Sequence, residues 1–132
     1  MQPILKIWYD ALRDEGKMKG LKCKDCGAIE FPPVPVCNSC GKFDMEWVEI
    51  SGECEVLSFA FSTMGIAPYH QNPTLCGWVK LKEGMLLNST ILDVNEEEQP
   101  ALLERLKKGN IPARLEIHPL DDVISYPMIR LK

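Results

Sequence analysis

Two pairs of cysteines are the residues best suited to chemistry in this chain of 132 residues. Cys23 and Cys26 form one Cys-x-x-Cys unit, and Cys37 and Cys40 form a second. Two residues between thiolates allow one tight turn to present both sulfurs to a tetrahedral ion. A glycine follows each unit, where the backbone turns away from the metal with a positive φ angle. The spacing therefore predicts a closed zinc ribbon with four cysteine ligands.

Two other interpretations of these cysteines are open. The same four thiolates would hold a rubredoxin-type iron, and a Cys-x-x-Cys unit can also be a redox pair. A redox pair normally appears once, near a βαβ pattern that this sequence lacks. Because four ligands leave no open coordination position, we expect a structural metal, which replaces the core that a segment of about 30 residues cannot build.

The remaining candidates for covalent chemistry are two single cysteines, Cys54 and Cys76, in strand-like sequence. We interpret both as small buried hydrophobic residues. A catalytic thiolate needs a base nearby, and nothing in the sequence pairs either cysteine with the two histidines, His70 and His118. We therefore expect no catalytic residue in this chain and no activity when it is isolated.

Charge and hydropathy exclude several classes of protein. The net charge is −4 and the isoelectric point is about 5.2, whereas binding to phosphate backbones requires clustered lysine and arginine. The longest uncharged stretch, residues 56–79, is interrupted by polar residues and two prolines, unlike a membrane helix. The first 15 residues lack the apolar core of a signal peptide. We expect a cytoplasmic protein with no membrane segment.

The elements that position the ribbon begin with an amphipathic helix, predicted over Pro3–Glu15 and ended by Gly16. Its apolar stripe consists of Ile4, Ile7, Trp8, Ala11 and Leu12. Two interpretations of this stripe are open. Either the helix packs on its own domain, or it docks a partner through large anchors such as Trp8.

The sequence after the ribbon predicts five strands and one helix. The strands cover residues 54–61, 76–81, 85–92, 113–118 and 124–131, and Pro127 favours an edge position for the last. The helix lies between the third and fourth strands, begins at Asn95 or Pro100, and ends at Gly109. This order is that of an OB-type barrel, since an SH3-like barrel would not contain such a helix at that point. We place the boundary between ribbon and barrel after residue 47, giving parts 1–47 and 48–132.

A set of residues along almost the whole chain matches a known pattern: Trp8, Tyr9, both cysteine knuckles with their glycines, Phe31-Pro32-Pro33, Trp47, Ser51-Gly52, Pro73, Val79–Leu81, Glu83-Gly84 and Gly109. Through these residues the chain resembles a family of small prokaryotic proteins that associate with acyl-CoA enzymes, especially thiolases. Val34 stands where this family often has arginine, and Asn38 where it often has proline. The resemblance implies a mainly β protein, with an N-terminal helix and a rubredoxin-like zinc ribbon before a five-stranded OB-fold barrel with one helix.

The resemblance also implies a function. Such a protein is an accessory subunit that docks a thiolase-like catalytic subunit and helps to enclose the CoA thioester. On this hypothesis the coenzyme lies along one side of the barrel, near Phe61, Tyr69, Lys80 and Lys82, with the two lysines on its phosphates. The alternative is a nucleic-acid-binding module, in which Phe59, Phe61, Tyr69 and Trp78 would stack on bases. Only Lys80 and Lys82 lie near these aromatic residues in the sequence, which disfavours this alternative.

Overall fold

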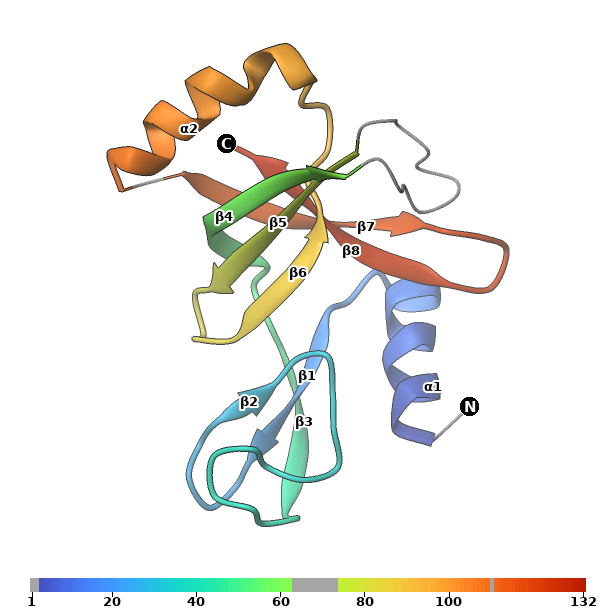
Figure 1. Ribbon diagram of the computed structural model, residues 1–132. Helices are drawn as coiled ribbons and strands as arrows, with labels where there is room; N and C mark the ends of the chain where they lie inside the picture. The colour runs from blue at the N-terminus through green and yellow to red at the C-terminus, as the bar shows by residue number, and fades with distance from the viewer. Residues whose placement is uncertain (1–2, 63–73, 110) are drawn as a thin grey trace.

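The computed structural model describes residues 3–62, 74–109 and 111–132, arranged around two sheets (Figure 1). The helical segments are α1 (Pro3–Asp10), the π turn η1 (Ala11–Glu15), the 3-10 turn η2 (Glu96–Glu98) and α2 (Gln99–Lys107). The strands are β1 (Lys19–Cys23), β2 (Ile29–Glu30), β3 (Met45–Glu49), β4 (Glu53–Ser62), β5 (Thr74–Leu81), β6 (Leu86–Thr90), β7 (Pro112–Pro119) and β8 (Ser125–Leu131). The ribbon sheet has the order β2-β1-β3, and the barrel sheet has the order β6-β5-β4-β7-β8.

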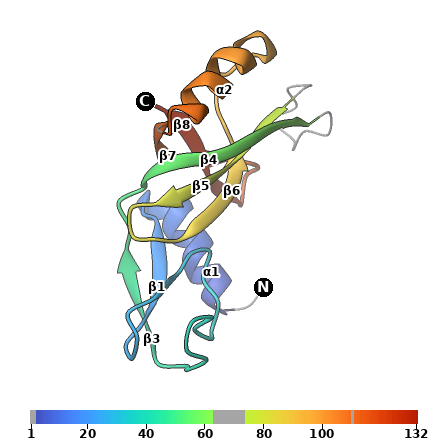
Figure 2. The same ribbon diagram turned by 60° about the vertical axis from the view of Figure 1, so that its left-hand side comes forward.

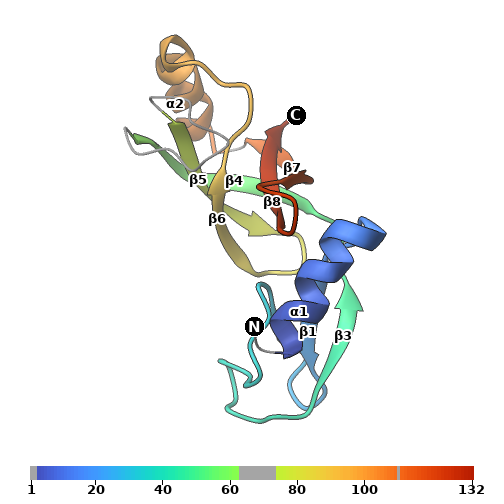
Figure 3. The ribbon, with the colours of Figure 1, turned by 90° about the vertical axis from the view of Figure 1, so that its right-hand side faces the viewer.

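The structure contains a helical segment over Pro3–Glu15, which confirms the predicted N-terminal helix. Its last turn, Ala11–Glu15, is π-helical. Gly16 ends it in the left-handed conformation, at φ 64°. Figures 1 and 3 show α1 beside the ribbon, with its later end against the barrel. The Arg13 guanidinium donates a hydrogen bond of 3.2 Å to the Val123 carbonyl, in the β7–β8 turn. The helix therefore connects the two sheets.

Trp8 is buried within the chain itself, with only 1% of its surface exposed. Its ring meets Phe31 of the ribbon edge-on at a centroid distance of 5.4 Å, and Tyr126 of β8 at 5.8 Å. The interpretation of Trp8 as an exposed anchor for a partner is therefore wrong. The indole is enclosed because ribbon and barrel both contribute an aromatic ring to it, so the helix packs on its own chain.

The five-stranded sheet confirms the OB-type order. All its ladders are antiparallel, and a single parallel bridge between Ile91 and Ile129 brings β6 to β8, which nearly closes the barrel (Figure 2). Helix α2 lies between β6 and β7 in the chain, which contradicts an SH3-like barrel. Pro100 occupies its first turn, so the later of the two predicted starts is confirmed. Strand β8 lies at one edge of the five-stranded sheet, the position that Pro127 predicts.

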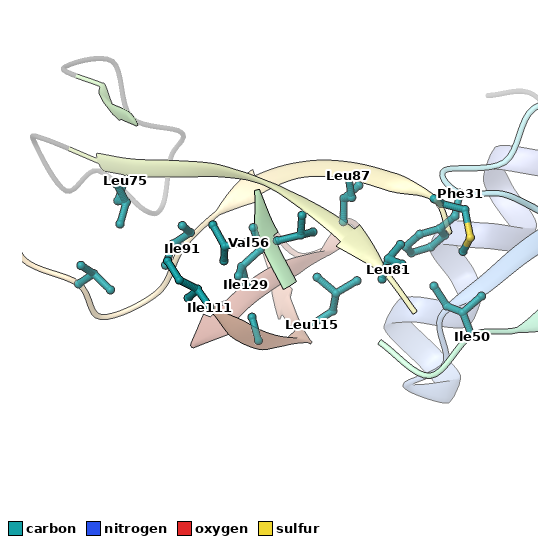
Figure 4. Close-up of a cluster of buried hydrophobic side chains, with 14 of the residues drawn as sticks. Phe31, Ile50, Val56, Leu75, Leu81, Leu87, Ile91, Ile111, Leu115 and Ile129 are labelled. Carbon is teal, nitrogen blue, oxygen red and sulfur yellow. The ribbon is translucent and has the colours of Figure 1, made fainter. Parts of the chain in front are cut away.

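One hydrophobic cluster serves both the ribbon and the barrel. Leu75, Ile91 and Ile129 belong to its barrel part, and Phe31 and Ile50 lie at the ribbon end beside Leu81 (Figure 4). The boundary after residue 47 stays a prediction, since this cluster is continuous across it. None of the described helices has the length and hydropathy that crossing a membrane requires.

Candidate metal centre and coenzyme groove

The ribbon brings its four cysteine sulfurs together. All four lie within 4.8 Å of one another, with Sγ–Sγ distances of 3.6 Å between Cys23 and Cys40 and 3.5 Å between Cys26 and Cys37. Sulfurs bound at about 2.3 Å to one tetrahedral zinc ion lie about 3.8 Å apart. Cys23 and Cys37 are buried, whereas Cys26 and Cys40 are exposed. The arrangement fits a closed four-sulfur site at the surface of the ribbon.

The two knuckles repeat the same backbone geometry. The Gly27 amide donates to the Cys23 carbonyl at 2.9 Å, and the Gly41 amide donates to the Cys37 carbonyl at 2.8 Å. Both glycines have positive φ angles, 80° and 77°. This conformation suits glycine because a Cβ atom would clash with the backbone. The glycine after each pair is therefore required by the turn that presents both sulfurs.

The second knuckle is also held by a carboxylate that the sequence analysis missed. The backbone amide of Asn38 donates to one oxygen of Glu30 at 2.8 Å, and the Asn38 side-chain amide donates to the other at 3.0 Å. Backbone amides of Cys40 and Ser39 lower the pKa of the Cys37 thiol to about 7, which favours the thiolate that a metal binds. In the sequence, Glu30 is a single acidic residue directly before Phe31-Pro32-Pro33, and no spacing motif links it to Asn38.

The two single cysteines lie in the barrel, Cys54 in β4 and Cys76 in β5, and both are half-buried. Burial raises the pKa of the Cys54 thiol to about 11, so this thiol stays protonated at neutral pH. His118 lies in β7 with its Nε2 atom 3.2 Å from the Glu116 carboxylate, and His70 lies outside the described residues. The interpretation of Cys54 as a small hydrophobic residue fits this environment.

Two of the predicted coenzyme contacts, Lys80 and Lys82, line one cavity of about 360 Å³. Lys132 lines it as well and pairs with Glu53. The hydrogen bond from Lys132 is the main cause that lowers the pKa of Glu53. We call this cavity, which is also lined by Cys54, Glu55, Leu81 and Pro112, the lysine groove.

The other two predicted contacts are not brought into this groove. Phe61 is half-buried and packs against the core. In the β4–β5 ladder Phe61 lies opposite Leu75, whereas Lys80 lies opposite Glu55, near the other end of β4. Tyr69 lies outside the described residues. Of the aromatic residues considered for stacking, Phe59 is likewise half-buried, while Trp78 is 47% exposed.

Comparison with known proteins places the chain in a family. A family model described as "ChsH2, rubredoxin-like zinc ribbon domain" matches residues 10–46, which include all four cysteines. A DUF35 domain-containing scaffold protein of Methanocaldococcus jannaschii is 30% identical over 99 residues, covering 72% of this chain and 68% of that protein. The chain belongs to the DUF35 family. Family and geometry agree on the ribbon of this DUF35 protein, which therefore carries a structural zinc site.

Other relatives carry names of enzyme subunits. The benzoylsuccinyl-CoA thiolase subunit BbsA of Thauera aromatica is 32% identical over 68 residues, which cover 52% of this chain and 46% of BbsA. A probable enoyl-CoA hydratase alpha subunit of Thermomonospora curvata is 26% identical over 105 residues, covering 76% of this chain. The DUF35 chain thus spans only 33% of that hydratase subunit and less than half of BbsA.

Solved structures share the whole fold. The structure described as "Ltp2-ChsH2(DUF35) aldolase" has a TM-score of 0.76 at 22% identity and covers 99% of this chain and 96% of its own. A DUF35 protein of unknown function from Sulfolobus solfataricus has a TM-score of 0.61 at 18% identity, covering 100% of this chain and 87% of that one. Helix, ribbon and barrel therefore form one shared architecture, which confirms the fold class expected from the sequence.

Proposed function

We propose that this chain is a non-catalytic accessory subunit of an acyl-CoA thiolase or thiolase/synthase complex. In this role it docks the catalytic subunit and helps to enclose the CoA thioester. The observation that carries the proposal is the similarity to BbsA, a protein named as a subunit of a thiolase. Such a complex would work in the cytoplasm, where thiolates such as those of the ribbon stay reduced.

The inventory of thiols supports an accessory role. Thioester condensation needs a cysteine nucleophile with a base that activates it. Four cysteines of this chain converge on the metal site, and four sulfur ligands leave the zinc no open position for a substrate. The Cys54 thiol has a raised pKa of about 11 and is a poor nucleophile at neutral pH. We therefore assign the chemistry to the partner subunit.

The lysine groove supports a contact with the coenzyme. Lys80, Lys82 and Lys132 gather there, on a chain whose net charge is −4. Ammonium groups of this kind bind the phosphates of a nucleotide, and the three lysines outnumber the two glutamates that line the groove, Glu53 and Glu55. We propose that Lys80 and Lys82 contact the CoA phosphates. Contacts of Phe61 and Tyr69 with the coenzyme stay predictions from the family resemblance.

The ribbon offers a better docking anchor than Trp8. Phe43 is 75% exposed, more than any other large hydrophobic side chain described. Two ion pairs lie beside it, joining Lys24 to Asp44 at 3.6 Å and Lys42 to Asp25 at 3.8 Å. An exposed aromatic ring within a polar rim is the usual composition of an interface centre. We propose that Phe43 contacts the catalytic subunit.

Co-expression with a thiolase-like catalytic subunit from the same genome, followed by gel filtration, tests the docking. The wild-type chain should elute with that subunit. Phe43→Ser should weaken the complex about tenfold or more, because truncating a central aromatic anchor costs about 2 kcal/mol. Leu103→Ser is the matched control, since Leu103 is 43% exposed on α2 and should have no effect. Separate elution of the wild-type proteins, with retardation of single-stranded DNA at physiological salt, would favour the nucleic-acid-binding alternative.

A further inference from the structure

A second cavity, of about 280 Å³, lies where β6 approaches β8 beneath α1. Its lining includes four hydroxyl groups and a thiol, from Tyr9, Ser89, Thr90, Tyr126 and Cys76, together with Met128. Among the described residues that line it there is no aspartate, glutamate, lysine, arginine or histidine. We call it the neutral cavity, in contrast to the lysine groove.

The outer face of β5 connects the two cavities. Lys80 lines the lysine groove and Cys76 lines the neutral cavity. Residues two apart in a strand share a face, so these two and Trp78 lie on one side of β5. The alternate residues Leu75, Val79 and Leu81 are buried in the barrel. At a rise of about 3.3 Å per residue, the Cα atoms of Lys80 and Cys76 are about 13 Å apart.

The surface between the cavities is uncharged. Trp78 lies midway along it and is 47% exposed. On either side, the ladder places Ser58 of β4 and Asn88 of β6 opposite Trp78, and both are exposed. Figure 1 shows β5 between these two strands. An aromatic face flanked by a hydroxyl and an amide suits a long uncharged chain that contains amide groups.

We infer that an acyl-CoA lies along this face, with its phosphates at the lysine groove and a neutral acyl group in the neutral cavity. The inference rests on the proposed function and adds a substrate class to it. An acyl group with a free carboxylate is disfavoured, because burying a charge without a partner is costly. The cavity instead offers hydrogen-bonding groups and apolar surface to an uncharged acyl group.

The polar groups of the cavity are consistent with this specificity. The Ser89 hydroxyl donates to the Pro127 carbonyl at 2.6 Å, so its hydrogen is already used within the barrel. Burial, and then the neighbouring Tyr9, raises the pKa of Tyr126, so its hydroxyl is neutral at pH 7. Neither group supplies the positive charge that a carboxylate needs.

Calorimetric titration of the full chain with CoA, benzoyl-CoA and succinyl-CoA tests the inference. Benzoyl-CoA should bind about tenfold or more tightly than CoA, because its ring is buried, whereas succinyl-CoA should bind no more tightly than CoA. Asn88 also lines the neutral cavity and is exposed, so Asn88→Asp places a carboxylate at the cavity with almost no change of shape. This variant should lose most of the preference for benzoyl-CoA over CoA. Asn95→Asp, the same change at an exposed position before η2, is the control and should keep that preference.

Lys80→Gln distinguishes failure of the inference from failure of the proposed function. This variant should bind all three ligands more weakly, by a similar factor, because all three carry the same phosphates. Equal affinities for CoA, benzoyl-CoA and succinyl-CoA, with Lys80→Gln still weakening each, would overturn the inference and leave the coenzyme contact in place. Absence of binding by all three ligands would overturn both the coenzyme contact and the inference.

Discussion

Replacing Trp8 with alanine should destabilise the junction between helix, ribbon and barrel. The indole is 1% exposed and meets Tyr9, Phe31 and Tyr126 edge-on, at centroid distances of 4.9, 5.4 and 5.8 Å. Truncation of a buried tryptophan to alanine costs about 3–5 kcal/mol. Within the part of the chain that the structure describes, the indole N–H has no hydrogen-bond partner, so no hydrogen bond is lost. We therefore expect about 3 kcal/mol for Trp8→Ala.

Thermal unfolding followed by circular dichroism measures this effect. A loss of about 3 kcal/mol should lower the midpoint by about 10 °C in a chain of this size. Trp8→Phe keeps a ring and removes the unpartnered N–H, so its midpoint should lie well above that of Trp8→Ala. Ile7→Ala, at a neighbouring position that is 44% exposed, is the control and should cost less than about 1 kcal/mol. A Trp8→Ala midpoint within about 2 °C of the wild type would refute the reasoning from burial.

Three further predictions concern the metal, an ion-pair network and a turn. Chelation of zinc, or Cys37→Ser, should unfold the ribbon, because metal binding stabilises its fold. Circular dichroism should show the loss of structure, and elemental analysis should show less than the roughly one zinc per chain of the wild type. A ribbon that stays folded without metal would contradict this prediction. Hydrogen bonds from Arg130, then from His118, lower the pKa of Glu116 from 4.5 to about 2. The stabilisation by Glu116 is thus complete above about pH 4.5 and is lost as the pH falls towards 2. Glu116→Gln should lower the midpoint of thermal unfolding at pH 7 but hardly at pH 2. An equal decrease of the midpoint at both pH values would show that the effect does not come from the charge of Glu116. The Ser51 amide donates to the Glu83 carboxylate at 2.9 Å, so Glu83→Ala should cost about 1 kcal/mol in denaturant unfolding, and an unchanged midpoint would contradict this.

The parts of the site that the sequence predicts correctly depend on local spacing. The sulfurs of Cys23 and Cys26 meet because only two residues separate them, and the second pair repeats the pattern. The turns that present them need glycine at a fixed position, which is visible in the sequence. The order of the barrel strands and the helix along the chain follows in the same way from alternation, turn residues and the position of the helix.

The parts that it does not predict depend on contacts between distant residues. Trp8 is enclosed by Phe31 and Tyr126, and the latter lies 118 positions away, so periodicity alone leaves its partner open. Lys132 reaches the groove of Lys80 only because β7 lies between β4 and β8 in the sheet. The resemblance implies that Phe61 and Lys80 belong to one coenzyme site, but the two residues lie near opposite ends of the β4–β5 pair.

The rate of thiolysis by the partner thiolase subunit, measured with and without this chain, tests the central claim most directly. The account predicts no turnover of acetoacetyl-CoA by the isolated chain and a rate for the co-purified complex well above that of the catalytic subunit alone. Addition of the wild-type chain should restore the rate, whereas Phe43→Ser should do so only at concentrations about tenfold higher. Turnover by the isolated chain, or a full rate from the catalytic subunit without it, would contradict the assignment of an accessory subunit.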